Sequence, residues 1–142
     1  KIIRSFGSMG VGNSQFNYPS GILVDPRTDE IIVCDHNNNR LQAFDYHGNF
    51  LRVIGSPGSA NGEFTAPFAV KLNSKDQFVV TDTDNHRIQM FDRNWNHIRS
   101  FGNYGQKKGQ LVEPMGMAID SHDNIFVVEY GNSRVSVFDS QG

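Results

Sequence analysis

The sequence is poor in cysteine and has no long apolar run. Cys34 is the single cysteine in 142 residues, so no internal disulfide can form, and nothing in the chain requires an oxidising compartment. The longest apolar runs have four residues, such as IIVC at 31–34, which is too short for a membrane-spanning helix or a signal-peptide core. We therefore expect no membrane association and a cytoplasmic location.

The sequence also lacks a strong excess of charge of either sign. Its 13 basic and 15 acidic residues give a formal net charge of −2. The global basic field that is typical of a nucleic-acid-binding protein is therefore absent, although a local basic patch is compatible with this balance. The length allows one domain with a core and is short for two. Because the chain begins at Lys1 without an initiator Met, we expect it to be a piece of a longer protein.

What the chain does contain is one pattern in three copies. RSFG at 4–7 matches RVIG at 52–55 and RSFG at 99–102, which are 48 and 47 residues apart. The same spacing relates the prolines at positions 19, 67 and 114. A period of about 40–50 residues built from strand-like segments predicts the blades of a β-propeller rather than a helical solenoid. We place the repeats at about 1–48, 49–95 and 96–142 and treat them as a fragment of one propeller domain.

Each copy divides into four short candidate strands. In the middle copy these are AVKLN (69–73), FVVTD (78–82), RIQMFD (87–92) and NHIRSFG (96–102). β-branched and aromatic residues dominate them, and Asn, Asp, Gly and Ser fill the joints. No segment of ten or more residues has helical periodicity. The sequence thus predicts an all-β chain of three four-stranded blade units.

The strand register is offset from the ends of the chain. KIIRSFG at 1–7 matches the fourth strand of later copies, so the chain starts on an outer strand and closes after a third strand, near 138–142. Three blades cannot close a ring, because propellers need about four to eight, and unpaired outer strands invite association. Either further sequence supplies the rest of the ring, or two copies pair head to tail. In such a homodimer, residues 1–7 of one chain would complete the blade that ends at 139 of the other.

The copies resemble NHL repeats. The middle copy contains DNHRIQMFD at 84–92, with the Asn-His pair for which the family is named. The other copies read NNNRLQAFD at 37–45 and GNSRVSVFD at 131–139, so both depart at the histidine. The resemblance covers essentially the whole chain, and in general character it is to the C-terminal NHL domain of TRIM-NHL proteins. It implies an NHL-type β-propeller with six blades, of which this chain is half.

An acidic residue followed five positions later by an arginine recurs in every copy. The pairs are Asp35 with Arg40, Asp82 with Arg87, and Glu129 with Arg134. Because a residue needed once for function has no reason to recur at fixed spacing, we interpret these pairs as structural, either intrablade ion pairs or hydrogen-bonded loop tethers. Ligand binding is the less favoured interpretation. Asn38, Asn85 and Asn132, in the same loops, are interpreted as residues able to adopt the left-handed conformation.

The pattern favours neither a metal site nor catalysis. A zinc site needs three or four converging ligands, and among the five histidines only His36 and His86 lie in equivalent loops, with no obvious third ligand. Propeller lyases are expected to place His and acidic ligands on their inner strands. Here the inner strands read GILV, AVKL and GMAI. We therefore expect no metal, no cofactor and no catalytic residue.

Binding residues are expected where the copies differ and side chains are exposed. In propellers of this family, the loop after the second strand and the long loop between blades share one face. Aromatic side chains there can stack on bases and lysines can contact phosphates. The candidates are Tyr18, His36, Asn37, Phe68, His86, Tyr104, Lys107, Lys108 and Tyr130.

The resemblance implies a recognition module without catalysis. Our first hypothesis is RNA binding, to a single strand or a stem-loop, through this face for post-transcriptional control, because several TRIM-NHL domains bind RNA there. The alternative is a protein–protein docking platform that recruits substrates to a TRIM-type ubiquitin-ligase module elsewhere in the full chain. The slightly acidic balance favours docking, whereas the family resemblance favours RNA.

Overall fold

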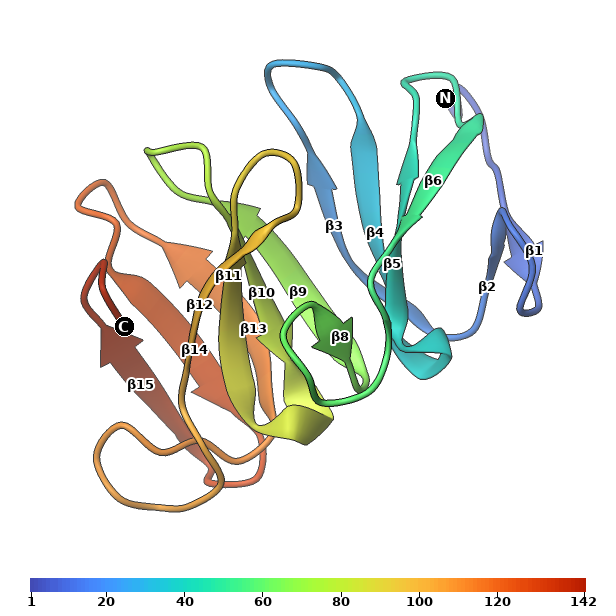
Figure 1. The fold of residues 1–142 in the computed structure, drawn as a ribbon. Helices are drawn as coiled ribbons and strands as arrows, with labels where there is room; N and C mark the ends of the chain where they lie inside the picture. Colours follow the sequence, from blue (N-terminus) through green and yellow to red (C-terminus); the bar gives the residue numbers. More distant parts are fainter.

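The computed structural model describes residues 1–142, and its main feature is three antiparallel sheets arranged side by side (Figure 1). The first sheet has the order β3-β4-β5-β6, and the second has the order β9-β10-β11-β12. The third sheet, β13-β14-β15, has three strands. The prediction of an all-β chain built from consecutive blade units is confirmed.

The strand bounds follow the repeat. The first blade contains β3 (Pro19–Val24), β4 (Ile31–Asp35), β5 (Arg40–Phe44) and β6 (Phe50–Ile54). The second contains β9 (Pro67–Leu72), β10 (Phe78–Asp82), β11 (Arg87–Phe91) and β12 (His97–Phe101). The third contains β13 (Pro114–Ile119), β14 (Ile125–Glu129) and β15 (Arg134–Phe138).

Short elements complete each unit. Two single-turn 3₁₀ helices, η1 (His36–Asn38) and η2 (Thr83–Asn85), join the second strand of a blade to the third. The long loops that enter the blades contain parallel two-residue pairs, β1 (Ser8–Met9) with β2 (Gln15–Phe16) and β7 (Ser56–Pro57) with β8 (Glu63–Phe64). The third long loop keeps this contact as a single bridge between Tyr104 and Leu111. No helix in the structure has the length and apolarity needed to cross a membrane.

The core lies between the blades. One apolar cluster joins the first blade to the second and includes Ile32, Leu41, Val70 and Phe78. A second cluster, which includes Ile88, Met90, Ile125 and Val127, joins the second blade to the third. The second blade is therefore covered on both faces, and the first and third blades on one face each.

Residues 1–7 form no strand, and no strand of the structure pairs with them. They nevertheless lie where an outer strand belongs. The Phe6 and Phe44 rings are 5.0 Å apart at 50°, and the equivalent Phe101 and Phe138 rings are 5.0 Å apart at 54°. Arg4 also donates to the Tyr46 carbonyl, much as Arg99 donates to a carbonyl after β15. The segment thus packs on the first blade as β12 packs on the third.

Candidate recognition face

The short loops after the second strands and the long interblade loops lie at the same end of the molecule, the lower end in Figure 1. Backbone hydrogen bonds join them in each blade. Asp84 N–H donates to the Thr65 carbonyl at 3.0 Å, and Tyr130 N–H donates to the Glu113 carbonyl at 3.0 Å. The first blade has the matching bond from Asn37 N–H to the Asn17 carbonyl. We call this end the loop face.

A buried carboxylate anchors the loop face in every blade. In the second blade Asp82 is 0% exposed and accepts four hydrogen bonds. The donors are Thr65 N–H at 2.8 Å, Arg87 Nε at 2.8 Å, Asn85 Nδ2 at 3.0 Å and Gln89 Nε2 at 3.0 Å. Because a buried charge needs a partner and satisfied lone pairs, this set explains why the acid recurs.

The arginine of each pair also fixes the long loop. Arg87 Nη1 donates to the Ser59 carbonyl at 2.9 Å, and Nη2 donates to the carbonyls of Ala60 at 2.9 Å and Glu63 at 3.1 Å. The planar guanidinium suits this role because its five N–H donors diverge in a fixed fork. The arginine thus serves both as an ion-pair partner and as a loop tether.

The other two blades repeat the arrangement. Arg40 Nε lies 2.8 Å from Asp35 Oδ2, and Arg134 Nε lies 2.7 Å from Glu129 Oε2. Burial raises the pKa of Glu129, but hydrogen bonds from Arg134, Ser136 and others outweigh it and hold the pKa below its usual value. The three acids are buried, and Arg40 and Arg87 are nearly so, whereas the Arg134 side chain is 34% exposed. The pairs therefore serve mainly the interior of the blades.

The sequence analysis missed two glutamines of this network and placed the three left-handed residues one position off. Gln42 and Gln89 are 0% exposed, and Gln89 Nε2 donates to both Asp82 and the Glu63 carbonyl. The signal was present as a glutamine two positions after the arginine in two copies. The interpretation of Asn38, Asn85 and Asn132 as left-handed residues was wrong by one position. The left-handed residues are Asn39, His86 and Ser133, with φ of 55°, 53° and 50°.

These left-handed residues bond across the interfaces between blades. Asn39 Oδ1 accepts from Ala66 N–H at 2.8 Å, and His86 Nδ1 accepts from Glu113 N–H at 3.0 Å. His36 Nδ1 lies 3.3 Å from the Pro67 carbonyl, also across an interface. One ring nitrogen of each candidate histidine is therefore committed to joining blades.

The candidate residues form two aromatic pairs at these interfaces and several isolated side chains. His36 meets Phe68 edge-on at 6.0 Å, and His86 meets Tyr104 edge-on at 5.0 Å. Tyr18 and Tyr130 lie on opposite end blades, so the structure does not bring them together within one chain. The Asn37 side chain bonds to Asn17 at 3.3 Å.

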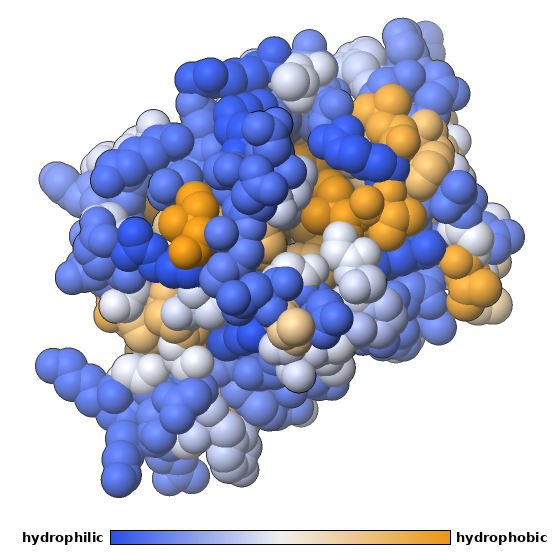
Figure 2. Space-filling model, in the orientation of Figure 1, coloured by the Kyte–Doolittle hydropathy of each residue, from blue (hydrophilic) through white to orange (hydrophobic).

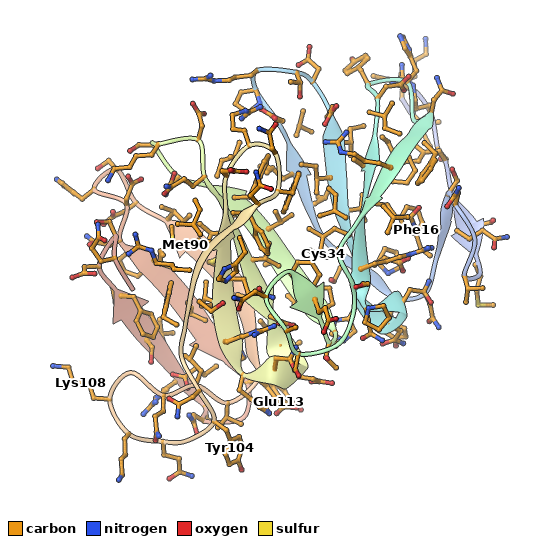
Figure 3. All side chains as sticks on the ribbon, viewed as in Figure 1. Phe16, Cys34, Met90, Tyr104, Lys108 and Glu113 are labelled. Atoms are coloured by element: carbon orange, nitrogen blue, oxygen red, sulfur yellow. The ribbon has the colours of Figure 1, made fainter.

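The most accessible candidates are tyrosines and lysines. Tyr18, Tyr104 and Tyr130 are 76%, 69% and 71% exposed. Lys107 and Lys108 are exposed in the long loop of the third blade. Figure 3 shows Tyr104 and Lys108 projecting from that loop away from the sheets. The visible surface around the blades is mostly hydrophilic, with apolar atoms gathered over the first blade (Figure 2).

No three His, Cys, Asp or Glu side chains come together as a metal-ligand cluster. Cys34 is buried between the first two blades, and burial raises the pKa of its thiol.

The repeat unit described above, with its buried acid–arginine pair, also matches a known family. A family model for the NHL repeat matches residues 16–44 and 65–91, which contain the acid–arginine pairs of the first two blades. The chain carries NHL repeats. The expectation drawn from DNHRIQMFD is thereby confirmed.

The curated relatives with similar NHL-bearing stretches are TRIM-NHL proteins. Protein brain tumor of Drosophila melanogaster is 42% identical over 73 residues, which are 50% of this chain and 7% of that protein. Protein lin-41 of Caenorhabditis elegans is 47% identical over 49 residues, 34% of this chain and 4% of that protein. The matched stretches are thus less than a tenth of these relatives' length. The resemblance supports a recognition module for protein or RNA.

Solved structures with the same architecture are β-propeller proteins. A Bacteroides caccae protein of unknown function has a TM-score of 0.67 at 15% identity, covering 85% of this chain and 45% of that one. A streptogramin B lyase has a TM-score of 0.62 at 15% identity, covering 87% and 38%. A Xanthomonas campestris gluconolactonase has a TM-score of 0.66 at 13% identity, covering 82% and 36%. These likenesses establish the propeller fold, which enzymes also use.

Proposed function

We propose that the loop face binds single-stranded RNA, with the long loop of the third blade as its main contact, in cytoplasmic post-transcriptional control. The observation that carries this proposal is the grouping of exposed Tyr104, Lys107 and Lys108 on one loop, whose backbone is held in place by hydrogen bonds from the blade. Arg134 holds that loop by donating to the carbonyls of Gln106 at 2.7 Å and Gln110 at 3.0 Å.

The chemistry of these side chains suits a nucleic-acid strand. An exposed tyrosine ring offers a stacking surface for an unpaired base, and base–aromatic stacking contributes about 1–3 kcal/mol per base. Two adjacent lysines supply positive charge for the phosphates that flank that base. Asp84 is exposed on the loop of the second blade and would repel phosphate, so we assign the phosphate contacts to the third blade.

We assign the histidines of this face to joining the blades. His86 Nδ1 accepts from Glu113 N–H, so in the neutral ring Nε2 carries the proton and no ring nitrogen is free to act as a general base. His36 Nδ1 faces the Pro67 carbonyl, and its ring packs edge-on against Phe68. The resemblance to TRIM-NHL proteins supports recognition rather than catalysis.

The decisive experiment measures the binding of a labelled random-sequence single-stranded RNA over a range of salt concentrations. The Lys107→Glu, Lys108→Glu double variant should lose binding, because both phosphate contacts become repulsive. The Lys107→Gln, Lys108→Gln double variant removes the two charges without reversing them. Each lost phosphate contact lowers the steepness of log affinity against log salt by about 0.7 for a single strand, so the slope should flatten by about 1.4.

The matched control carries the same charge change at the opposite end of the molecule. Lys1 and Lys75 are both exposed, and Lys75 lies in the β9–β10 turn, away from the loop face. Lys1→Glu with Lys75→Glu should leave RNA affinity within a factor of a few of the parent. Retained RNA binding in the Lys107→Glu, Lys108→Glu double variant would show that this loop does not contact the RNA.

One observation favours protein docking as the second candidate function. Met9 and Val11, on the long loop of the first blade, are 85% and 77% exposed. Exposed apolar side chains of this kind suit a protein partner, such as a substrate presented to a ubiquitin-ligase module. Docking predicts partner binding that changes little with salt and falls in Met9→Ser, whereas RNA binding predicts the opposite on both counts.

A further inference from the structure

Each junction between neighbouring blades has two side-chain hydrogen bonds at the loop face. At the junction of the second and third blades, Thr83 Oγ1 donates to the Pro114 carbonyl at 2.7 Å. The other bond runs in the opposite direction, from Glu113 N–H to His86 Nδ1 at 3.0 Å. The second blade thus contributes one donor and one acceptor, and both reach the point where the long loop of the third blade enters β13.

The junction of the first and second blades repeats these two bonds with different side chains. His36, at the repeat position of Thr83, has its Nδ1 3.3 Å from the Pro67 carbonyl. Asn39, at the repeat position of His86, accepts from Ala66 N–H through Oδ1 at 2.8 Å. A histidine therefore occupies the donor position at one junction and the acceptor position at the other.

The backbone partners of the two histidines determine which ring nitrogen carries the proton. A backbone N–H can only donate, so His86 accepts through an unprotonated Nδ1 and its ring is neutral. A carbonyl can only accept, so His36 bonds to Pro67 through a protonated Nδ1. In the imidazolium ion both nitrogens are donors. Uptake of a proton is therefore compatible with the bond of His36 and eliminates the bond of His86.

No carboxylate holds the His86 ring in place once that bond is lost. The ion pairs of the chain include none with His86. Its ring meets the Tyr104 ring edge-on at 5.0 Å. The titratable and charged residues of the elements that meet at this junction are Asp84, Arg87, Tyr104, Lys107, Lys108, Glu113 and Tyr130.

We propose that His86 is a pH-sensitive latch between the second and third blades. At neutral pH its ring accepts from Glu113 N–H and holds the end of the long loop of the third blade. Histidine side chains ordinarily take up a proton between about pH 5 and 8, and protonation of His86 releases this N–H. The bond from Thr83 to Pro114 does not titrate in this range, so the junction loosens locally while the blades stay together.

The latch acts on the loop that carries the exposed side chains Tyr104, Lys107 and Lys108. Arg134 anchors the middle of this loop on the third blade through the carbonyls of Gln106 and Gln110. Release of Glu113 N–H therefore frees the end of the loop and leaves its middle attached. The inference does not depend on RNA binding.

The first test determines the protonation of both rings by NMR in the ¹⁵N-labelled 142-residue chain. At neutral pH, long-range ¹H–¹⁵N spectra should show His86 with its proton on Nε2 and His36 with its proton on Nδ1. The same tautomer at both histidines would overturn the proposal. This measurement uses the parent chain, so it does not depend on the folding of any variant.

The second test follows amide hydrogen exchange from neutral pH to about pH 5, a range in which histidines titrate and most carboxylates do not. Rates are expressed as protection relative to an unstructured peptide, which removes the intrinsic effect of pH. Protection of the Glu113 amide should fall by about fivefold or more on acidification, as expected for one lost hydrogen bond. Protection of the Ala66 amide, which Asn39 accepts, should stay constant.

The first junction also supplies the matched variants. His86→Asn copies the acceptor of Asn39 and should make the protection of the Glu113 amide independent of pH. Asn39→His transfers the titratable acceptor and should make the protection of the Ala66 amide fall with acid. His36→Thr, which removes the other junction histidine, should change neither response. Constant protection of Glu113 in the parent chain overturns the proposal, and so does a pH dependence of Glu113 that survives in His86→Asn.

Discussion

The second and third blades share one sequence pattern, yet their second strands are buried to very different extents. Every residue of β10 (Phe78–Asp82) is buried, with exposures of 2% or less. In β14 (Ile125–Glu129) burial alternates, because Phe126 and Val128 are 38% and 49% exposed while their neighbours are at 1% or less. The second blade has a neighbour on both faces and the third on one. Burial at a repeat position is thus determined by the neighbouring blade as well as by the residue.

The two blades also differ in how they hold their long loops. In the second blade, Gln89 Nε2 donates to the Glu63 carbonyl at 2.7 Å, and Gln89 Oε1 accepts from Gly62 N–H at 3.0 Å. The third blade has Ser136 at this position, whose hydroxyl reaches Glu129 and not the loop. Glu129 is longer than Asp82 and Ser136 is shorter than Gln89, so the buried carboxylate of the third blade still accepts a hydrogen bond from this position. The loop that carries Lys107 and Lys108 therefore has fewer anchors than its counterpart.

The largest expected difference between the blades concerns their arginines. Arg87→Ala leaves the fully buried Asp82 carboxylate without its ion partner, and removing one partner of a buried pair costs about 3–5 kcal/mol of unfolding free energy. The Arg134 side chain is 34% exposed against 13% for Arg87, so water can replace it more readily. Urea unfolding should show a clearly smaller loss for Arg134→Ala.

Arg87→Lys is the control for this comparison. It keeps the charge but loses the fork that reaches the Ser59 and Ala60 carbonyls, so it should lie between the parent and Arg87→Ala. Equal losses for Arg87→Ala and Arg134→Ala would show that the two tethers are equivalent despite their different exposure.

The next prediction compares one repeat position with and without a neighbouring blade. Ile88→Ala opens a cavity at a fully buried site and should cost about 2–5 kcal/mol. Val135→Ala, at the same repeat position of the third blade, should cost about 0.5 kcal/mol or less, because Val135 is 61% exposed. A loss of unfolding free energy for Val135→Ala as large as that for Ile88→Ala would show that exposure does not set the cost at this repeat position.

These comparisons also show what the sequence could predict. The period, the strands and the acid–arginine pairs were readable because each recurs in three copies, and repetition distinguishes structural residues from those needed once. The roles of Gln89 and of the left-handed His86 were not readable, because they depend on which backbone groups of a distant loop or blade come within reach. The same limit applies to Phe126 and Val135, whose apolar character is visible in the sequence but whose exposure depends on a neighbour.

A smaller effect is expected from exchanging the loop anchor. Gln89→Ser removes two hydrogen bonds to the long loop of the second blade, at about 1 kcal/mol each before relaxation. The amide of Gly62, which donates to Gln89, should then exchange its hydrogen faster. Ser136→Gln should not produce the reverse gain, because Glu129 is one methylene longer than Asp82 and occupies the space. Slower exchange across the loop 103–111 in Ser136→Gln would contradict this steric argument.

The smallest predicted effect is a change in acid sensitivity. Hydrogen bonds from Arg134, Ser136 and Asn132 lower the pKa of Glu129 in spite of its burial. A carboxyl whose pKa is lower in the folded state contributes stability that is complete above its ordinary value of 4.5 and is lost as pH falls through the folded pKa. Glu129→Gln is less stable at neutral pH, yet its unfolding free energy should fall less steeply below about pH 4.5. Turn carboxylates such as Asp92, whose pKa is lowered by a hydrogen bond from the Asn96 side chain, are unchanged in the variant, so part of the acid dependence should remain. Parallel pH profiles for the parent and Glu129→Gln would show that the third-blade anchor titrates alike in the folded and unfolded chains.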